Sequence, residues 1–106
     1  MTYRVVVTIR ANADAIQVVR RKRETSVRSA ERWYAGLEKA IAKLNKFPER
    51  HPIAEEESDW AGIPLRQMIY GKKPATYRIL FSISGDAVVL HQIRHSARDS
   101  IHNDEK

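Results

Sequence analysis

The segment from Ser26 to Phe47 constrains the fold most, because it carries the longest regular hydrophobic pattern in the chain. Its apolar residues recur every three or four positions, which places them on one face of an α-helix. These residues are Ala30, Trp33, Leu37, Ala40, Ile41, Leu44 and Phe47. Pro48 ends the helix, since proline lacks the backbone N–H that the next turn needs. Such a helix has to bury its apolar face against another layer.

A second helix is expected just before it, from Ala13 to about Glu24. Asn12 is the expected N-cap, and Asp14 lies near the positive end of the helix dipole. A short break at Thr25-Ser26 then joins the two helices into an antiparallel hairpin.

Alternating apolar residues predict four strands, one before the helices and three after them. The expected strands are Tyr3–Arg10, Leu65–Tyr70, Thr76–Ser84 and Ala87–Arg94. Turns at Gly71–Pro74 and Gly85-Asp86 connect the last three.

The pattern is less informative for two segments of the chain. In the last strand, Val88 and Leu90 compete with Val89 and Ile93 for the buried face, so the pattern does not tell which face is buried. The segment from His51 to Pro64 is polar, contains two prolines and is expected to be a loop.

The resulting order, β-α-α-β-β-β, predicts an α+β fold. The helical hairpin should cover one face of a small, mainly antiparallel four-stranded sheet and leave the other face as the working surface. A chain of 106 residues suffices for one domain. We expect that domain to span residues 1–98 and to be followed by a polar tail at residues 99–106.

The chain has no cysteine, which excludes disulfides, thiolate zinc sites and a cysteine nucleophile. Its net charge of +6 and its pI near 9.9 favour an anionic partner such as nucleic acid or an acidic protein. No apolar run approaches the length of a membrane span, and the alternating N-terminus lacks a secretory signal core. We therefore expect a cytoplasmic protein that has no membrane partner.

Several short motifs follow one another along the chain. They are Tyr3-Arg4-Val5-Val6-Val7 with Ala13-Asp14; Ala30-Glu31-Arg32-Trp33 to Ala40-Ile41-Ala42-Lys43-Leu44 with Pro48; Leu65-Arg66; Tyr77-Arg78-Ile79-Leu80-Phe81 with Gly85-Asp86-Ala87-Val88; and Ile93-Arg94-His95 with Arg98-Asp99. The ordered set resembles the RelE/ParE superfamily, the plasmid stabilisation toxins of bacterial type II toxin–antitoxin systems.

This resemblance implies a growth-inhibiting toxin that binds a cognate antitoxin protein and uses no cofactor. RelE-type members cut messenger RNA on the ribosome, which favours a metal-independent, ribosome-dependent endoribonuclease. ParE-type members keep the fold and inhibit DNA gyrase by binding, without chemistry. No tyrosine follows Tyr77, although active RelE-type members carry an aromatic hydroxyl near the C-terminus. Gyrase inhibition, or a degenerate toxin that only binds its antitoxin, is therefore the alternative.

Three residues are candidates for catalysis: Arg78, Arg66 and His95. Attack by a 2′-hydroxyl needs a base, an acid and fixed cations beside the phosphate. A guanidinium grips two phosphate oxygens, and histidine titrates near neutrality. Each of these residues could instead have a purely structural role. Arg78 can pair with a carboxylate of the segment Glu55–Asp59, Arg66 can support the fold, and His95 can be a surface histidine near the tail.

Four more cations are expected to contact the target: Arg94, Arg98, Lys72 and Lys73. Glu56 or Glu57 could supply a general base, although adjacent glutamates are more often a solvated loop. The histidines lack the spacing of metal ligands, so no metal site is expected.

Overall fold

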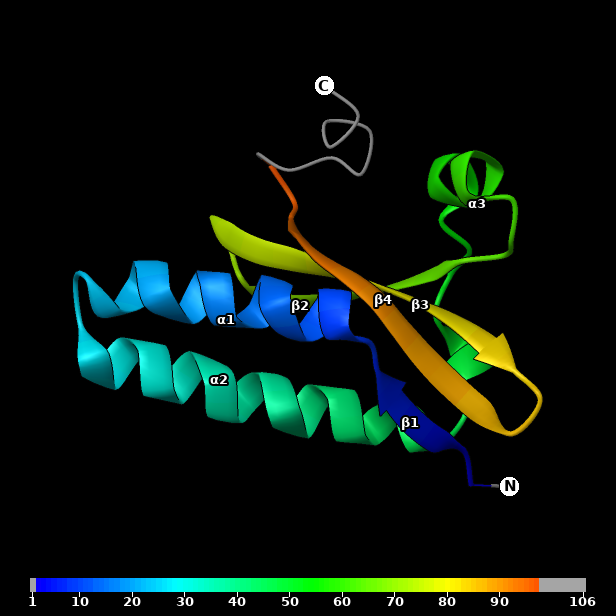
Figure 1. Cartoon of the computed structure of the whole chain (residues 1–106), viewed down its shortest axis with the longest axis horizontal. Helices are drawn as coiled ribbons and strands as arrows, with labels where there is room; N and C mark the ends of the chain where they lie inside the picture. Colours follow the sequence, from blue (N-terminus) through cyan, green and yellow to red (C-terminus); the bar gives the residue numbers. More distant parts are fainter. Residues whose placement is uncertain (1, 98–106) are drawn as a thin grey trace.

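The computed structural model of the chain describes residues 2–97 and contains one mixed sheet and three α-helices (Figure 1). In chain order, the elements are β1 (Arg4–Val7), α1 (Ile9–Arg23), α2 (Val27–Ala42), α3 (Glu55–Ala61), β2 (Arg66–Lys72), β3 (Ala75–Ser84) and β4 (Ala87–His95). Two 3₁₀ turns, Lys43–Asn45 and Pro48–Arg50, follow α2.

The strands are arranged in the order β1-β4-β3-β2. β1 runs parallel to β4, whereas β4, β3 and β2 form an antiparallel meander. This confirms the predicted α+β fold with a mainly antiparallel four-stranded sheet, to which the structure adds α3.

The hairpin of α1 and α2 packs on one face of the sheet, where the main core lies (Figure 1). Trp33 of α2 makes edge-to-face contacts with Tyr70 of β2 and Tyr77 of β3. The Tyr70 hydroxyl also donates a hydrogen bond of 2.6 Å to the Trp33 carbonyl. Beneath these rings, the sheet contributes Met68, Ile79, Phe81, Val88, Leu90 and Ile93.

The first strand is shorter than predicted, and the first helix begins earlier. Thr8 is the N-cap, since its hydroxyl accepts a hydrogen bond of 3.1 Å from the Ala11 N–H. The predicted cap Asn12 therefore lies inside α1. The side chain of Ile9, expected within the strand, is 91% exposed. Both residues are of types that cap helices well, and the one nearer to the strand forms the cap.

The long helix ends earlier than its hydrophobic stripe suggests. After Ala42 the backbone tightens into the 3₁₀ turn, which changes the angle between successive side chains. Leu44 remains buried, but Phe47 has a left-handed backbone conformation and is 72% exposed. The prediction that Phe47 belongs to the core was therefore wrong.

A β-bulge resolves the ambiguity of the last strand. Leu80 is paired with Gln92 and Phe81 with Leu90, so His91 is an extra residue in β4. Because of this extra residue, Val88 and Leu90 before the bulge and Ile93 after it all point toward the core. All three are therefore buried.

The segment predicted to be a polar loop contains α3. Its first turn holds Glu55, Glu56 and Glu57, where carboxylates interact favourably with the helix dipole. The Ser58 hydroxyl fixes the base of the helix by donating to the Ala54 carbonyl and accepting from the Leu65 N–H. Gly62 ends the helix in a left-handed conformation (φ 76°).

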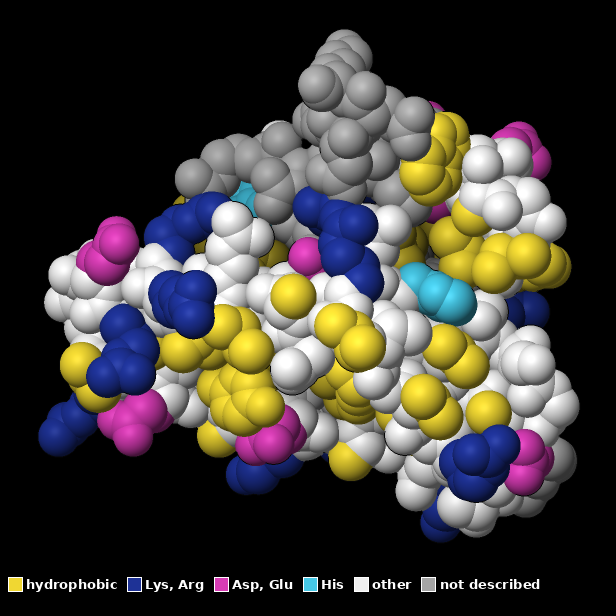
Figure 2. Space-filling view, in the orientation of Figure 1, with side chains coloured by type: hydrophobic (Ala, Val, Ile, Leu, Met, Phe, Trp, Pro, Cys, Tyr) yellow, Lys and Arg dark blue, Asp and Glu magenta, His cyan; other side chains and the backbone are white. Residues whose placement is uncertain are grey.

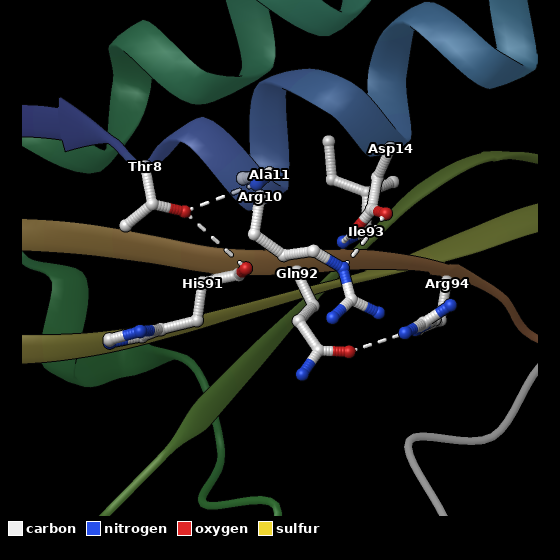
Figure 3. A network of polar contacts seen from close by, with 8 residues as sticks. All are labelled: Thr8, Arg10, Ala11, Asp14, His91, Gln92, Ile93 and Arg94. Atoms are coloured by element: carbon white, nitrogen blue, oxygen red, sulfur yellow. Dashed lines mark hydrogen bonds and ion pairs between the residues drawn. The ribbon is translucent and has the colours of Figure 1, made fainter. Parts of the chain in front are cut away.

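Because β1 is short, part of the edge of β4 has no neighbouring strand, and a side chain of α1 accepts a hydrogen bond there instead. β1 pairs only with Ala87 to Leu90. Further along, the Ile93 N–H donates a buried hydrogen bond of 2.9 Å to Asp14 (Figure 3). The Asp14 carboxylate also accepts from Arg10 at 3.3 Å.

Replacing Asp14 by alanine should lower the free energy of unfolding by about 2 kcal/mol, because a buried N–H would lose its acceptor. Urea denaturation followed by circular dichroism measures this loss. Asp86→Ala removes an exposed carboxylate that pairs with Arg4 and should change the midpoint little. A loss for Asp14→Ala no larger than that of the control would contradict this role.

Candidate functional site

The sheet has a second face, turned away from α1 and α2, which we call the outer face. Strand alternation assigns it because Tyr77, Ile79 and Phe81 belong to the main core and the residues between them point the other way. The outer-face residues include Gln67 and Ile69 of β2, Arg78, Leu80 and Ser82 of β3, and Val89, His91, Gln92 and Arg94 of β4. The outer face is therefore rich in polar and cationic side chains.

Arg78 lies at the centre of this face and has two partners. Its Nε donates to Oε1 of Gln67 at 2.8 Å. Its Nη1 lies 2.6 Å from Oε2 of Glu57 in α3. The two side chains are only 21% and 7% exposed, so water screens this ion pair weakly. The carboxylate partner expected for Arg78 from the segment Glu55–Asp59 is thus Glu57.

Part of the outer face is covered, which corrects the expectation of an open sheet face. Ala54, just before α3, packs on the fully buried side chain of Leu80. Glu57 extends this cover to Arg78. Figure 1 shows α3 away from the helical hairpin, beyond the strands.

Arg94 is the cross-strand neighbour of Arg78, since the two residues are directly paired between β3 and β4. Its Nε donates to Oε1 of Gln92 at 2.8 Å (Figure 3). Like charges at directly opposed positions of a sheet repel each other. Two guanidiniums held in this way form a surface that suits an anion with several oxygens.

His95 lies on the opposite face from Arg78. It is buried, and its ring makes an edge-to-face contact with Tyr77, which itself packs on Trp33 of the hairpin. Its Nδ1 accepts a hydrogen bond of 3.1 Å from the Ala97 N–H. The sheet therefore separates the imidazole of His95 from the guanidinium of Arg78.

Arg66 is also distant from Arg78. It pairs opposite Phe81, three residues along β3 from Arg78, which corresponds to about 10 Å along a strand. Its Nη1 donates to the carbonyls of Glu49 and His51, at 2.9 and 2.7 Å. These bonds tie the 3₁₀ turn at Pro48–Arg50 to the sheet edge. The structure does not bring Arg66, Arg78 and His95 together.

The other predicted target contacts are spread over the molecule. Lys72 ends β2 and Lys73 lies in the following turn, and both are exposed. Arg94 lies on the outer face beside Arg78. Arg98 and the tail at residues 99–106 lie outside the described residues.

His91 is a titratable side chain of the outer face that the sequence did not single out. It is the bulge residue, and its Nε2 lies 2.8 Å from the Ser82 hydroxyl. Partial burial lowers the pKa of His91. The pKa of His51 is also lowered, by burial first and then by the nearby charges of Arg50 and Arg66. The bulge places both His91 and its neighbour Gln92 on the outer face, an arrangement that simple alternation along the whole strand does not predict.

A second surface feature is the groove between α1 and α2. Its apolar residues include Ile16, Val19, Val27 and Tyr34. Arg20 and Arg23 line it from α1 and Glu31 and Glu38 from α2. Figure 2 shows hydrophobic surface over the seam of the two helices, with basic side chains beside it toward their connection.

Within residues 2–97, no group of three His, Cys, Asp or Glu side chains is placed to hold a metal ion. No helix in this range is long and apolar enough to cross a membrane. No protein-family model and no curated protein matches the sequence of this chain. What the site can do therefore follows from its own geometry and charge.

The lowered pKa of His91 predicts a stability that depends on pH. The unfolded chain binds protons more tightly at this residue than the folded chain does, so the free energy of unfolding should fall as the pH drops below about 6.5. His91→Gln should reduce this fall, measured by urea denaturation between about pH 7 and pH 5. Ser82→Ala keeps the titrating ring and should retain the slope. Equal slopes for His91→Gln and the unmodified chain would contradict the prediction.

Proposed function

We propose that this chain is the toxin component of a type II toxin–antitoxin system and acts on an anionic target through its outer face. The observation that carries the proposal is the pair of directly opposed arginines, Arg78 and Arg94, on that face. Together with the net charge of +6, they favour a phosphodiester chain or an acidic protein surface. Apart from the added helix α3, the order of strands and helices is the one expected from the sequence, which is compatible with the resemblance to RelE/ParE toxins.

Messenger RNA on the ribosome is the first target that we propose. Guanidiniums bind phosphate oxygens in two-point contacts and stabilise the charge that develops on phosphorus during cleavage. Arg78 can serve this purpose, and Glu57 is a carboxylate within contact of it. His95 lies on the opposite face of the sheet from Arg78. In this arrangement its imidazole does not reach a substrate that is bound at Arg78.

Inhibition of DNA gyrase by binding is the second candidate, and the position of His95 favours it. Cleavage needs an acid and a base on either side of one phosphate. Binding without chemistry needs only a complementary surface. The outer-face arginines can contact gyrase or DNA without any contribution from the imidazole.

For the antitoxin partner, we propose the groove between α1 and α2. An amphipathic helix or an extended segment could bury apolar side chains against Ile16, Val19 and Val27. Acidic residues of that segment would meet Arg20 and Arg23 at the same groove. This leaves the outer face to the target.

The test is induced expression of the chain alone in bacteria, with and without the neighbouring open reading frame. We expect growth arrest that co-expression of the neighbour relieves. New RNA 5′ ends inside translated messages would identify cleavage. Intact messages together with gyrase-dependent DNA breaks would identify the second target. Absence of arrest from folded, expressed protein would contradict the proposed function.

The outer face is tested with Arg94→Gln, which should abolish or strongly reduce the arrest because it removes one of the two opposed cations. Arg28→Gln removes an equal charge from the exposed surface of α2 and is the matched control. Arrest by Arg94→Gln at the level of the control would contradict a role of the outer face. The variant His95→Ala tests whether His95 transfers a proton during cleavage. Unchanged RNA cuts in this variant would exclude that role.

A further inference from the structure

The groove between α1 and α2 is lined by apolar side chains that the core does not use. Ile16 and Val27 line it and are 41% and 51% exposed. The same two helices already bury another set of apolar side chains against the sheet, to which α2 contributes Trp33 and Leu37. A contiguous apolar surface outside the core, flanked by charged side chains, is typical of an interaction site.

The charged residues of the groove are divided between its two sides. Arg20 and Arg23 line it from α1, whereas Glu31 and Glu38 line it from α2. All four side chains are exposed, and none of them forms an ion pair within residues 2–97. Their charges cancel, although the chain as a whole carries a net charge of +6. A surface with cations on one side and carboxylates on the other is complementary to a second copy of itself.

The two sides of the groove also match in position along it. α1 and α2 run antiparallel, so residues equally far from their connection lie at the same level (Figure 1). Ile16 lies seven residues before the last residue of α1 and Tyr34 seven residues after the first residue of α2, which places each about 10 Å from the connection. Arg20 and Glu31 lie closer to it, at about 5 Å and 6 Å.

A two-fold rotation about the long axis of the groove uses this match. It places each α1 over the α2 of a second copy and leaves the level along the groove unchanged. Arg20 of one copy then faces Glu31 of the other, and Ile16 faces Tyr34, with each contact made twice as in any two-fold interface. The four helices form a bundle in which apolar side chains fill the centre and opposite charges flank them.

We propose that two copies of this chain pair through their α1–α2 grooves, with Arg20 of each copy on Glu31 of the other. Both copies are positively charged, but at about 0.15 M ionic strength exposed charges more than about 8 Å apart are largely screened. The contacts within the groove then decide the association. The pairing goes beyond the proposed function and does not rest on it. Where the groove receives an antitoxin, pairing and antitoxin binding exclude each other.

The first test is sedimentation equilibrium of the purified chain at physiological salt. The unmodified chain of 12.2 kDa should form a dimer as its concentration rises. Arg20→Glu and Glu31→Arg each place like charges opposite each other at both contacts, and each should weaken the dimer by about tenfold or more. An equimolar mixture of the two variants restores opposite charges at both contacts and should recover a mixed dimer.

Arg21→Glu is the matched control for Arg20→Glu. It makes the same change of charge at the next position of α1, which is exposed and does not line the groove. The control should form the dimer as well as the unmodified chain does. An equal loss in the control, a mixture of folded variants that does not recover, or an unmodified chain that stays monomeric at millimolar concentration would overturn the proposal. The last outcome would leave the groove to a partner of different sequence.

The second test examines which helices meet. The chain has no cysteine, so a single introduced cysteine reports one position. Ile16→Cys mixed with Tyr34→Cys should give a disulfide-linked dimer of the two variants on mild oxidation, since the rotation brings these positions together. Either variant alone should give much less, because the rotation places equivalent residues on opposite sides of the groove. Equal yields from the mixture and from the separate variants would contradict this geometry.

The result is separable from that of the expression test. A dimer formed by a chain that does not arrest growth would retain the pairing and remove the toxin function. Growth arrest by a chain that stays monomeric would leave the toxin function standing and remove the pairing.

Discussion

The hydrogen bond from the Ile93 N–H to Asp14 joins the two halves of this fold. β1 has four residues and β4 has nine, so β1 cannot pair with the whole of its neighbour. An unpaired, buried N–H costs about as much as a lost hydrogen bond, and the carboxylate of α1 removes that cost. Because Thr8 caps α1 directly after β1, Asp14 is brought beside β4. This bond helps to fix the hairpin on the face of the sheet where the main core lies.

The separation of the two faces decides which chemistry the molecule can support. Arg78 and Arg94 share the outer face, whereas His95 packs on Tyr77 toward the helices. Residues that follow each other in a strand point to opposite sides, so an Arg-His dipeptide at the end of β4 places its two side chains on opposite faces of the sheet. Sequence proximity in a motif is therefore poor evidence for a joint active site here. The outer face fits binding of an anion better than it fits a reaction that runs through His95.

Much of the fold was predictable because its signals are local. The stripe from Ala30 to Leu44 identifies the long helix, and the turn at Gly85-Asp86 identifies the hairpin between the last strands. The errors have equally definite causes. Phe47 leaves the stripe because the backbone tightens after Ala42, and the facing of β4 was hidden because one bulge residue, His91, breaks the alternation. The position of Arg66 was also hidden, since its partners are backbone carbonyls of a 3₁₀ turn that no side-chain pattern reports.

α3 is the element that the sequence predicts least, and the reason lies in long-range electrostatics. Three adjacent glutamates on a polar segment are typical of a solvated loop. Here one of them is buried, because the sheet offers it a guanidinium that is itself shielded from water. Neither group would be stable in that environment alone, since an uncompensated buried charge is strongly destabilising. The burial of Glu57 and the shielding of Arg78 from water thus have a common origin in this ion pair.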